Sequence, residues 1–255
     1  MLSKNEIKDI QSLRHKKFRE ETKLFVAEGT KIIGELLLLL PQQFKKIYGL
    51  KQWAEENNHS VNKVEYEIVS ETELERLSQL QTPNEVIAVL HHFEKKEPVV
   101  QNELALYLDA IQDPGNFGSI IRIADWFGIK QIICGEGCAD LYNIKVVQAS
   151  MASIARVNVF YDEELKWLKK QDVTRYATVL DGESVYTISN KVNGIIIIGN
   201  ESKGIQPSIM EMIDQKITIP KTGEAESLNA AVATGIILSH LIGKKQLRNK
   251  NQGKS

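Results

Sequence analysis

Short apolar runs recur along the second part of the chain and alternate with longer segments of helical periodicity. The runs that predict strands are LALYLDAI, KQIICG, NVF, RYATVLDG, GIIIIG and KITIP. The segments that predict helices are SIIRIADWFG, YNIKVVQASMASIARV, DEELKWLKKQ, QPSIMEMI and SLNAAVATGIILSHLIG. Apolar strands separated by helices are typical of a parallel sheet covered on both faces, so the fold class is α/β.

The first part of the chain follows a shorter pattern. Residues 1–35 are mixed in charge and predict helix throughout. After them, FKKIYGL, EYEIVS and NEVIAVLHHF predict strands, while KQWAEENN and SETELERLSQL predict helices, the second opened by Ser70 or Thr72. We predict a small α/β domain over 1–95, a linker over 96–103, a second domain over 104–246 and a basic, disordered tail over 247–255.

Composition excludes a few classes of protein. The chain has 255 residues and a net charge of −1, so attraction to nucleic acid requires a local basic patch. Cys134 and Cys138 are too few for a zinc site or a disulfide framework, and we expect free thiols in a reducing compartment, with no metal. There is no apolar signal segment, and LLLLLP is too short to span a membrane, which predicts a cytoplasmic protein with no membrane partner.

Three predicted strands are followed by more polar residues than a turn requires. These stretches are DPGNFGSIIR, GNESKG and PKTGEAESLN, and open parallel sheets bind ligands beyond the carboxyl ends of their strands. The chain has no dinucleotide-binding glycine fingerprint, no P-loop, no zinc-deaminase pattern and no nucleophile elbow. A phosphate-cradling loop is therefore not evident.

Each polar stretch also has a purely structural explanation. Asp113 to Asn116 is good turn sequence, and Arg122 could pair with Asp125 on a helix surface, although an arginine among isoleucines could equally point into a site. Ser227 is expected to cap the last helix, whereas capping does not explain Asn229. That helix is apolar nearly all round, so we expect it to be buried in the core, in a subunit interface, or in both.

Taken together, the three stretches resemble a known family. DPGNFGSIIRIADWFG, IIIIGNESKG and ITIPKTGEAESLNAAVATGIIL are similar to the three ordered motifs of the SpoU (TrmH-type) RNA ribose 2′-O-methyltransferases, in the SPOUT superfamily. More loosely, KFREETKLFVAEGTKII and TPNEVIAVL resemble the ribosomal-protein-like RNA-binding domain of that family. The resemblance implies a C-terminal trefoil knot, a homodimer and S-adenosyl-L-methionine as methyl donor. General topology rules alone would argue against a knot.

The resemblance also implies roles for individual residues. Catalytic roles fall on Asn116, Arg122, Glu201, Ser227 and Asn229, and cofactor contacts fall on Leu180, Ile198, Gly199, Asn200, Ile219 and Leu228. Many relatives have Val and Ser where this chain has Ala230 and Ala231, which we expect to alter helix packing rather than chemistry. The basic candidates for RNA contact are Arg14, Lys16, Lys17 and Arg19, with Arg122 at the active site and Lys244–Lys254 in the tail.

The chemistry of these residues agrees with that family. S-adenosylmethionine carries no phosphate, so the missing phosphate loop is no objection, and apolar side chains such as Ile198 and Leu228 suit its adenosyl group. Because arginine stays charged, we expect Arg122 to bind a phosphate or polarise the 2′-oxygen, oriented by Glu201 or Asn116, rather than to act as a base.

Several functions stay open. We favour methylation of large-subunit rRNA, since minimal tRNA-type relatives often lack the N-terminal domain. The alternatives are a tRNA ribose methyltransferase and a non-catalytic RNA-binding or assembly protein on the same fold. A nucleotide-binding metabolic enzyme is disfavoured by the missing phosphate loop.

Overall fold

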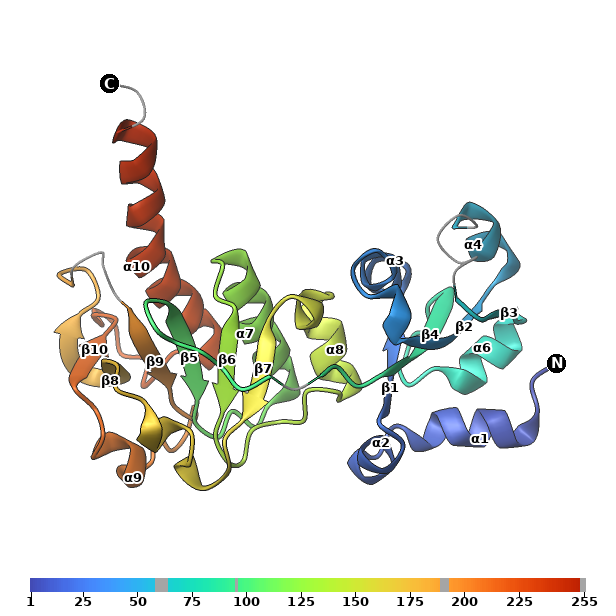
Figure 1. The fold of residues 1–255 in the computed structure, drawn as a ribbon, viewed down its shortest axis with the longest axis horizontal. Coiled ribbons are helices and arrows are strands. Elements are labelled where there is room, and N and C mark those ends of the chain that lie inside the picture. Colours follow the sequence, from blue (N-terminus) through green and yellow to red (C-terminus); the bar gives the residue numbers. More distant parts are fainter. Residues whose placement is uncertain (58–63, 95, 189–192, 253–255) are drawn as a thin grey trace. The chain divides into compact units, whose positions relative to one another are not determined.

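The computed structural model describes residues 1–57, 64–94, 96–188 and 193–252, and within 243–252 it describes only the helical backbone. The chain divides into two compact units, which Figure 1 shows as ribbons. The first unit contains Met1–Glu94 and Asp140–Ala155, and the second contains Lys95–Ala139 and Arg156–Ser255. This division differs from the predicted domain boundaries at Asp140–Ala155, a segment that sequence reasoning assigns to the second domain.

The first unit is built on a four-stranded sheet in the order β1-β4-β2-β3. Strand β4 is antiparallel to β1 and β2, while β3 is parallel to β2. The strands are β1 (Leu24–Glu28), β2 (Phe44–Gly49), β3 (Tyr66–Ile68) and β4 (Val86–His91), and the helices are α1 (Lys4–Ser12), α2 (Lys16–Thr22), α3 (Thr30–Leu39), α4 (Lys51–Glu56), α6 (Glu71–Leu77) and α8 (Ile144–Ser150).

Successive side chains of a strand point to opposite faces of the sheet. Since β1 is apolar at consecutive positions, both faces of the sheet carry apolar side chains that helices must cover. Leu24 and Val26 of β1 share a core with Val89 of β4 and with the apolar faces of α1 and α6. Phe25, which points to the other face, is fully buried, and α3 packs against β1 and β4. Ser70, one of the two predicted helix starts, is the N-cap of α6 in a capping box with Glu73.

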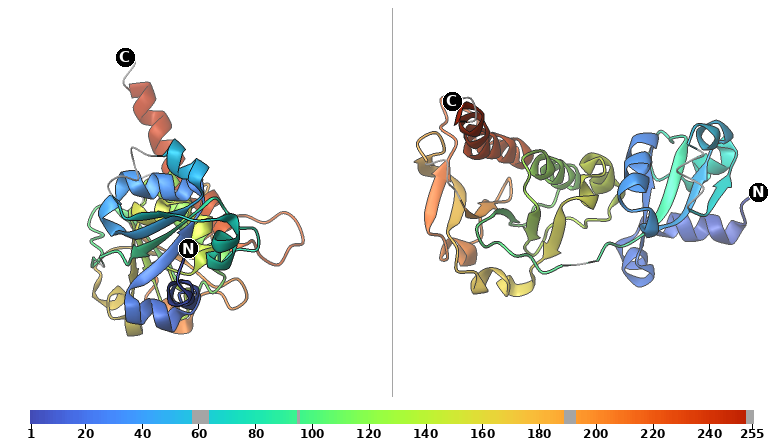
Figure 2. Two further views of the ribbon diagram at one scale, coloured as in Figure 1. Left: turned by 90° about the vertical axis from the view of Figure 1, so that its right-hand side faces the viewer. Right: turned by 45° about the horizontal axis from the view of Figure 1, so that its top comes forward.

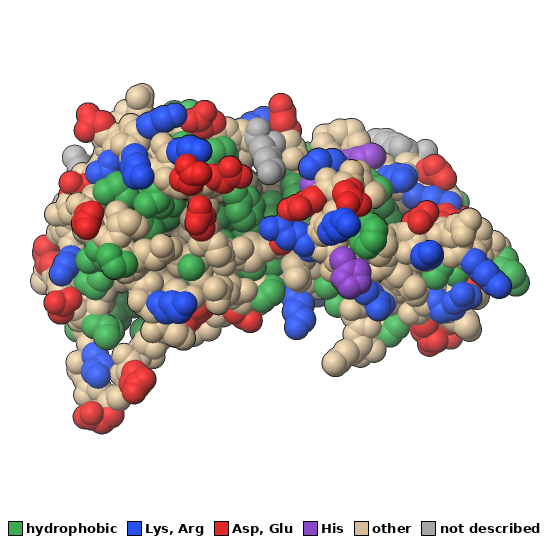
Figure 3. Space-filling view, turned by 90° about the horizontal axis from the view of Figure 1, so that it is seen from below, with side chains coloured by type: hydrophobic (Ala, Val, Ile, Leu, Met, Phe, Trp, Pro, Cys, Tyr) green, Lys and Arg blue, Asp and Glu red, His purple; other side chains and the backbone are tan. Residues whose placement is uncertain are grey.

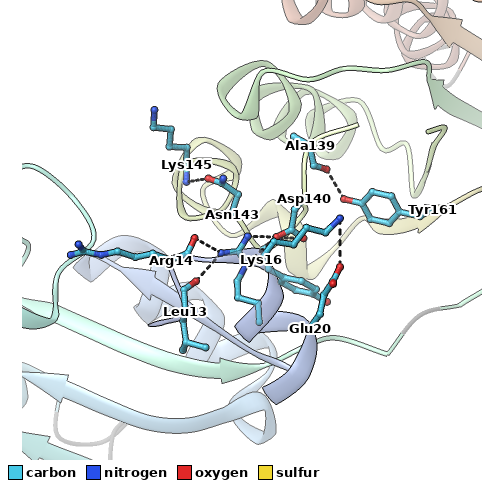
Figure 4. Close-up of polar contacts among 11 residues, drawn as sticks. Leu13, Arg14, Lys16, Glu20, Ala139, Asp140, Asn143, Lys145 and Tyr161 are labelled. Atoms are coloured by element: carbon cyan, nitrogen blue, oxygen red, sulfur yellow. Dashed lines mark hydrogen bonds and ion pairs between the residues drawn. The ribbon is translucent and has the colours of Figure 1, made fainter. Parts of the chain in front are cut away.

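A buried ion pair ties the segment Asp140–Ala155 to α2 within the first unit (Figure 4). Arg19 is only 4% exposed, and its guanidinium donates to the Asp140 carboxylate and to the carbonyls of Leu13 (2.7 Å) and Arg14 (2.8 Å). The ring of Tyr142 stacks on His92, with 3.8 Å between the ring centroids. Charge pairing and aromatic packing therefore hold this distant segment in the first unit.

The second unit is a six-stranded sheet in the order β10-β8-β9-β5-β6-β7, and every pairing between these strands is parallel. The predicted parallel α/β sheet is confirmed. The strands are β5 (Leu104–Leu108), β6 (Gln131–Cys134), β7 (Asn158–Tyr161), β8 (Arg175–Ser184), β9 (Gly194–Ile198) and β10 (Gln215–Thr218), and the helices are α7 (Pro114–Trp126), α9 (Pro207–Met210) and α10 (Ala230–Gln252). Helices α7 and α10 pack side by side (Figure 2).

The isoleucine-rich strand β9 lies in the middle of this sheet, between β8 and β5, and all five of its residues are buried. On one face, Ile195 and Ile197 share a core with Trp167, Leu168 and Ile209. The strand is therefore buried on both faces, as its unbroken apolar run predicts. The three polar stretches follow β9, its neighbour β5 and the edge strand β10.

Two predicted helices are wrong in extent or kind. Residues 24–28 lie inside the stretch that predicts helix, but they form the fully buried strand β1. The segment DEELKWLKKQ forms two 3-10 turns, Glu163–Leu165 and Leu168–Lys170, instead of a helix. The reason is local: the Asp162 carboxylate accepts the backbone N–H groups of Trp167 (2.7 Å) and Leu168 (3.1 Å), which competes with helical hydrogen bonding.

The helices α8 and α10 also differ from their predicted lengths. Helix α8 ends at Ser150, because Met151 and Ala152 have φ angles of 49° and 66° in the left-handed region. Helix α10 continues to Gln252, through residues predicted to be disordered, and residues 253–255 lie outside the described part. In the described ranges, no helix is long and apolar enough to cross a lipid bilayer.

We predict that Asp140→Ala lowers the free energy of unfolding of the first unit by about 3 kcal/mol, because it leaves the buried Arg19 cation without its carboxylate. The measurement is urea unfolding of the full chain followed by circular dichroism. The control is Lys16→Ala, which removes an exposed pair with Glu20 (3.5 Å) and should cost less than about 0.5 kcal/mol. Equal costs for the two variants would contradict a special role for the buried pair.

Candidate active site

The side-chain amide of Asn116 joins all three polar stretches. Its Nδ2 donates to Glu201 Oε1 at 2.5 Å, and its Oδ1 accepts from Asn229 Nδ2 at 2.7 Å. Asn116 lies in the first turn of α7, where its backbone N–H donates to Oδ1 of the N-cap residue Asp113 at 2.7 Å. The helix start thus fixes the backbone of Asn116, and the two neighbouring segments fix its amide.

Asn229 is the N-cap of α10, which corrects the expectation that Ser227 caps this helix. The Asn229 Oδ1 accepts the backbone N–H groups of Ala231 (3.0 Å) and Val232 (3.2 Å), while its Nδ2 reaches Asn116. Ser227 is exposed, and it makes no hydrogen bond among the described residues. One asparagine therefore begins the helix and connects it to the rest of the site.

Glu201 lies on a tight loop after β9. The backbones of Asn200 and Gly204 pair with each other at 3.0 and 2.9 Å, and Asn200 Oδ1 accepts the N–H groups of Ser202 and Lys203. A Cβ on Gly199 would lie 2.7 Å from the carbonyl carbon of Gly204 and 2.8 Å from Ile205 Cγ1. The backbone of Gly204 and the side chain of Ile205 therefore pack closely against Gly199, which leaves no room for a side chain there.

A buried carboxylate that sequence reasoning missed supports this loop. Asp109 directly follows β5 and is fully buried, and its two oxygens accept the backbone N–H and the side-chain Nε2 of Gln206, both at 2.6 Å. The next residue, Ala110, has a φ of 54°, and its carbonyl accepts from Asn200 Nδ2 at 2.8 Å. An acidic residue at the end of the apolar run LALYLD was the available signal.

The residues expected to contact the cofactor lie within β8, at the end of β9, and in the segments that follow β9 and β10. Ile198 is buried, Gly199 and Ile219 are half-buried, and the side chains of Leu180 and Leu228 are 75% and 46% exposed. The hydroxyl of Thr218 donates to the carbonyl of Leu180 at 3.1 Å, which connects the last residue of β10 to the middle of β8. Leu180 and Leu228 thus leave large apolar side chains accessible to solvent.

Arg122 lies apart from the hydrogen-bond network. Its side chain is exposed on the third turn of α7 and has no hydrogen bond or ion pair among the described residues. The carboxylate of Glu201 binds Asn116 rather than Arg122, so the expected orienting contact from Glu201 is not present. The carboxylate of Asp125 binds Arg156, with 2.8 Å between Oδ2 and Nε. The guanidinium of Arg122 is therefore available to a ligand.

The basic residues proposed for RNA contact differ in availability. Arg19 is removed from that set, because it is buried and its guanidinium is held by Asp140 and two carbonyls. Lys16 and Lys17 are exposed, but their ammonium groups lie 3.5 and 3.9 Å from the carboxylates of Glu20 and Glu21. Arg14 is exposed and donates to the Ser78 carbonyl at 2.6 Å. The side chains of Lys244–Lys254 lie outside the described part.

Charges are mixed on the face shown in Figure 3, where Lys and Arg side chains are interspersed with Asp and Glu in both units. This agrees with a net charge of −1 and with the i,i+4 pairs of α2. On this face, phosphate contacts would therefore come from individual cations that have no carboxylate partner.

A groove of about 870 Å³ lies between α7 and α10. Asn116 and Asn229 line it together with Ser119, Ile123, Val232 and Tyr186. Tyr186 and Val232 are 52% and 51% exposed, and the ring of Tyr186 packs edge-on against His240. The hydrogen-bond network thus lies at an open surface and not in a closed cavity.

Two free thiols lie close to the Asp109 segment, in agreement with the expectation of unpaired cysteines. Burial raises the pKa of the Cys134 thiol. A hydrogen bond from Cys134 lowers the pKa of Cys138, whose Sγ lies 3.2 Å from the Leu108 carbonyl oxygen. Among the described residues, no group of three or more potential metal ligands occurs.

Two protein families match the sequence, one over each of its two main parts. The SpoU rRNA Methylase family matches residues 103–239, and the MRM3-like substrate binding domain matches residues 4–88. The chain is 32% identical to the 23S rRNA (guanosine(2553)-2′-O)-methyltransferase RlmP of Bacillus subtilis, over 93% of this chain and 96% of that protein.

Solved structures share the fold of the whole chain. A protein from Porphyromonas gingivalis assigned to the TrmH family of RNA methyltransferases is 36% identical, with a TM-score of 0.84 over 96% of this chain and 99% of its own. An rRNA methyltransferase from Sinorhizobium meliloti, solved with S-adenosylmethionine bound, is 28% identical, with a TM-score of 0.81 over 97% of each chain.

We predict that Gly199→Ala destabilises the second unit by about 1–3 kcal/mol, because the new methyl group would collide with the backbone of Gly204. The measurement is thermal unfolding, together with the chemical shift of the Asn116 side-chain amide, which should move as Glu201 is displaced. Gly223→Ala is the control, since a Cβ there meets nothing within 4 Å. If the two alanine variants unfold alike, the loop is not held by this close approach.

Proposed function

The chain belongs to the SpoU rRNA methylase family, and from this premise we propose that it transfers a methyl group from S-adenosyl-L-methionine to a ribose 2′-hydroxyl of RNA. The observation that carries the proposal is the hydrogen-bond chain Glu201–Asn116–Asn229, in which the polar ends of three ordered motifs meet. Turns and helix caps do not require a carboxylate and two carboxamides at one place. A purely RNA-binding protein on this fold gives no reason for that convergence.

The strand ends of the second unit suit the proposed methyl donor. Leu180, Ile219 and Leu228 are partly or largely exposed and offer apolar surface for an adenosyl group, and the backbone of Ile198 and Gly199 at the end of β9 offers hydrogen-bonding groups. Since S-adenosylmethionine has no phosphate, it needs no phosphate-cradling loop, and its adenine can be held by backbone groups and apolar side chains. When bound, it supplies an electrophilic methyl group on a sulfonium centre.

The proposed role of the polar residues is to align and polarise the ribose hydroxyl. This hydroxyl must lose its proton as it attacks, and much of the rate would come from alignment. The permanently charged Arg122 binds a phosphate or the 2′-oxygen and does not serve as the base. Glu201 uses Oε1 to hold Asn116, which leaves Oε2 able to accept a hydrogen bond from substrate.

Large-subunit rRNA is the proposed substrate. The RlmP relative, which spans nearly the whole chain, acts on 23S rRNA, and residues 4–88 match a substrate-binding domain. Ribosomal RNA would place the protein in the cytoplasm. A tRNA substrate stays as the alternative, because the network that carries the chemistry does not depend on the kind of RNA.

We also propose that the enzyme is a homodimer with a C-terminal trefoil knot, and that it uses no metal. Support for the dimer comes from the groove between α7 and α10, whose lining residues Tyr186 and Val232 are each about half exposed. Exposed apolar and aromatic side chains that line a groove are typical of surfaces that another protein covers. The dimer would form next to the Asn116 network, which borders the same groove.

The test incubates the purified full chain with radiolabelled S-adenosylmethionine and unmodified transcripts of 23S rRNA, 16S rRNA or tRNA. We expect label only in the 23S transcript, at a 2′-O-methylated nucleotide located by alkaline-hydrolysis mapping. Sedimentation velocity of the same sample should give the mass of two chains. Label in tRNA would select the alternative substrate, and no label together with no cofactor binding by calorimetry would exclude a methyltransferase.

We predict that Arg122→Lys lowers kcat/KM for RNA by at least about 10-fold, because an ammonium cannot reproduce the two-pronged geometry of a guanidinium. The Kd of S-adenosylmethionine should stay unchanged. The control is Arg156→Lys, which alters an arginine engaged with Asp125 outside the network. Near-full activity of Arg122→Lys would exclude a role for an oriented guanidinium.

A further inference from the structure

One tryptophan of the second unit is exposed to an unusual degree. Trp126, the last residue of α7, is 83% exposed, while Trp53 and Trp167 are 1% and 3% exposed. Its indole makes no ring contact or hydrogen bond within the described part of the chain. Tryptophan is costly to leave in water, because it carries the largest apolar surface of any side chain.

The nearest available cation on the same helix face is Arg122. The two residues are four apart, so their side chains lie on one face of α7, opposite the buried face formed by Phe117, Ile121 and Ala124. Arg122 is exposed, and it forms no ion pair among the described residues. A flat aromatic surface and an unpaired guanidinium are therefore presented together.

Single-stranded RNA offers the matching chemistry. Its unstacked bases have flat faces that stack on aromatic side chains, and its phosphates bind arginine. A second copy of the chain would match the indole but would also have to provide a carboxylate for Arg122. The combination of the two groups thus favours RNA.

We propose that Trp126 is a stacking platform for a base of the RNA substrate, adjacent to a phosphate held by Arg122. This inference rests on the proposed function, since it assumes an RNA substrate. Ten residues separate Trp126 from Asn116, which is about 15 Å along the helix axis at a rise of 1.5 Å per residue. The stacked base therefore belongs to a nucleotide near the one that is methylated, and Trp126 acts on RNA binding and position.

The kinetic test uses the full chain and the RNA transcript that the wild-type protein methylates. Trp126→Ala should raise KM for RNA by about 5- to 100-fold, with kcat and the Kd of S-adenosylmethionine unchanged. Trp126→Phe should restore most of the affinity, because phenylalanine keeps a flat aromatic face. The matched control is Leu38→Ala, since Leu38 is a large apolar residue with a similar exposure of 79% and lies on α3.

The optical test uses the fluorescence of the same indole. A mixed-sequence RNA of about 12 nucleotides should protect the exposed tryptophan from acrylamide quenching. The Trp126→Phe variant, which retains only the two buried tryptophans, should show no such protection.

Three outcomes separate the possibilities. The stacking site is supported by a raised KM in Trp126→Ala, rescue by phenylalanine and protection of the indole. It is overturned if Trp126→Ala behaves like Leu38→Ala, or if Trp126→Ala halves the sedimentation mass, because the indole would then pack against a second copy. Failure of the proposed function is distinct, since the wild-type protein itself would then methylate no RNA.

Discussion

The side-chain amide of Asn116 is the interaction on which the arrangement of the second unit depends. It connects two partners that lie 85 and 113 residues away in the chain, and each bond uses a different end of the carboxamide. Exchanging the oxygen and nitrogen would set an oxygen against Glu201 and a nitrogen against the Nδ2 of Asn229. The amide therefore has one favourable orientation, and that orientation fixes the loop after β9 and the first turn of α10 relative to α7.

Each segment that meets at Asn116 is also held by hydrogen bonds of its own. The network therefore keeps a fixed geometry although it is partly exposed to solvent. The Asn200–Gly204 backbone pair closes the Glu201 loop, and Asp109 accepts the backbone N–H of Gln206 just after it. Asn229 itself caps α10. Each hydrogen bond at such a surface contributes only about 1 kcal/mol. Their main effect is to preorganise the site. The carboxylate, the amide and the helix start are already in place before a ligand binds, so binding loses little conformational entropy.

Most of the sheet could be predicted from sequence, because strands buried on both faces leave unbroken apolar runs such as GIIII. Interactions that override a local helical pattern were harder to predict from sequence. Asp162 replaces a predicted helix by two turns, and LFVAE forms a strand amid helical sequence, since its hydrogen bonds come from β4, far along the chain. In the site, Asn116, Glu201 and Asn229 were predicted and the structure brings them together. Asp109 was missed although it ends an apolar run, because its partner Gln206 lies 97 residues away in the chain. The capping role of Asn229 was missed because it depends on where the helix backbone begins, which a pattern of residue types does not contain.

Charge gives a second reason why function was difficult to locate in the sequence. The densest basic stretch, Arg14–Lys23, looks like the natural RNA surface, yet folding buries Arg19 and sets Lys16 and Lys17 beside glutamates. In the second unit, Arg122, Lys203 and Lys221 are exposed, have no carboxylate partner within the described part, and lie on the helix and loops of the three motifs. Lys169, Lys170 and Lys216 of the same unit are likewise exposed without a carboxylate partner. Only an unpaired cation gains a full interaction with a phosphate, because a paired one must first lose its carboxylate. The strand ends therefore carry cations that can bind phosphate without first losing a carboxylate, even though the net charge is −1.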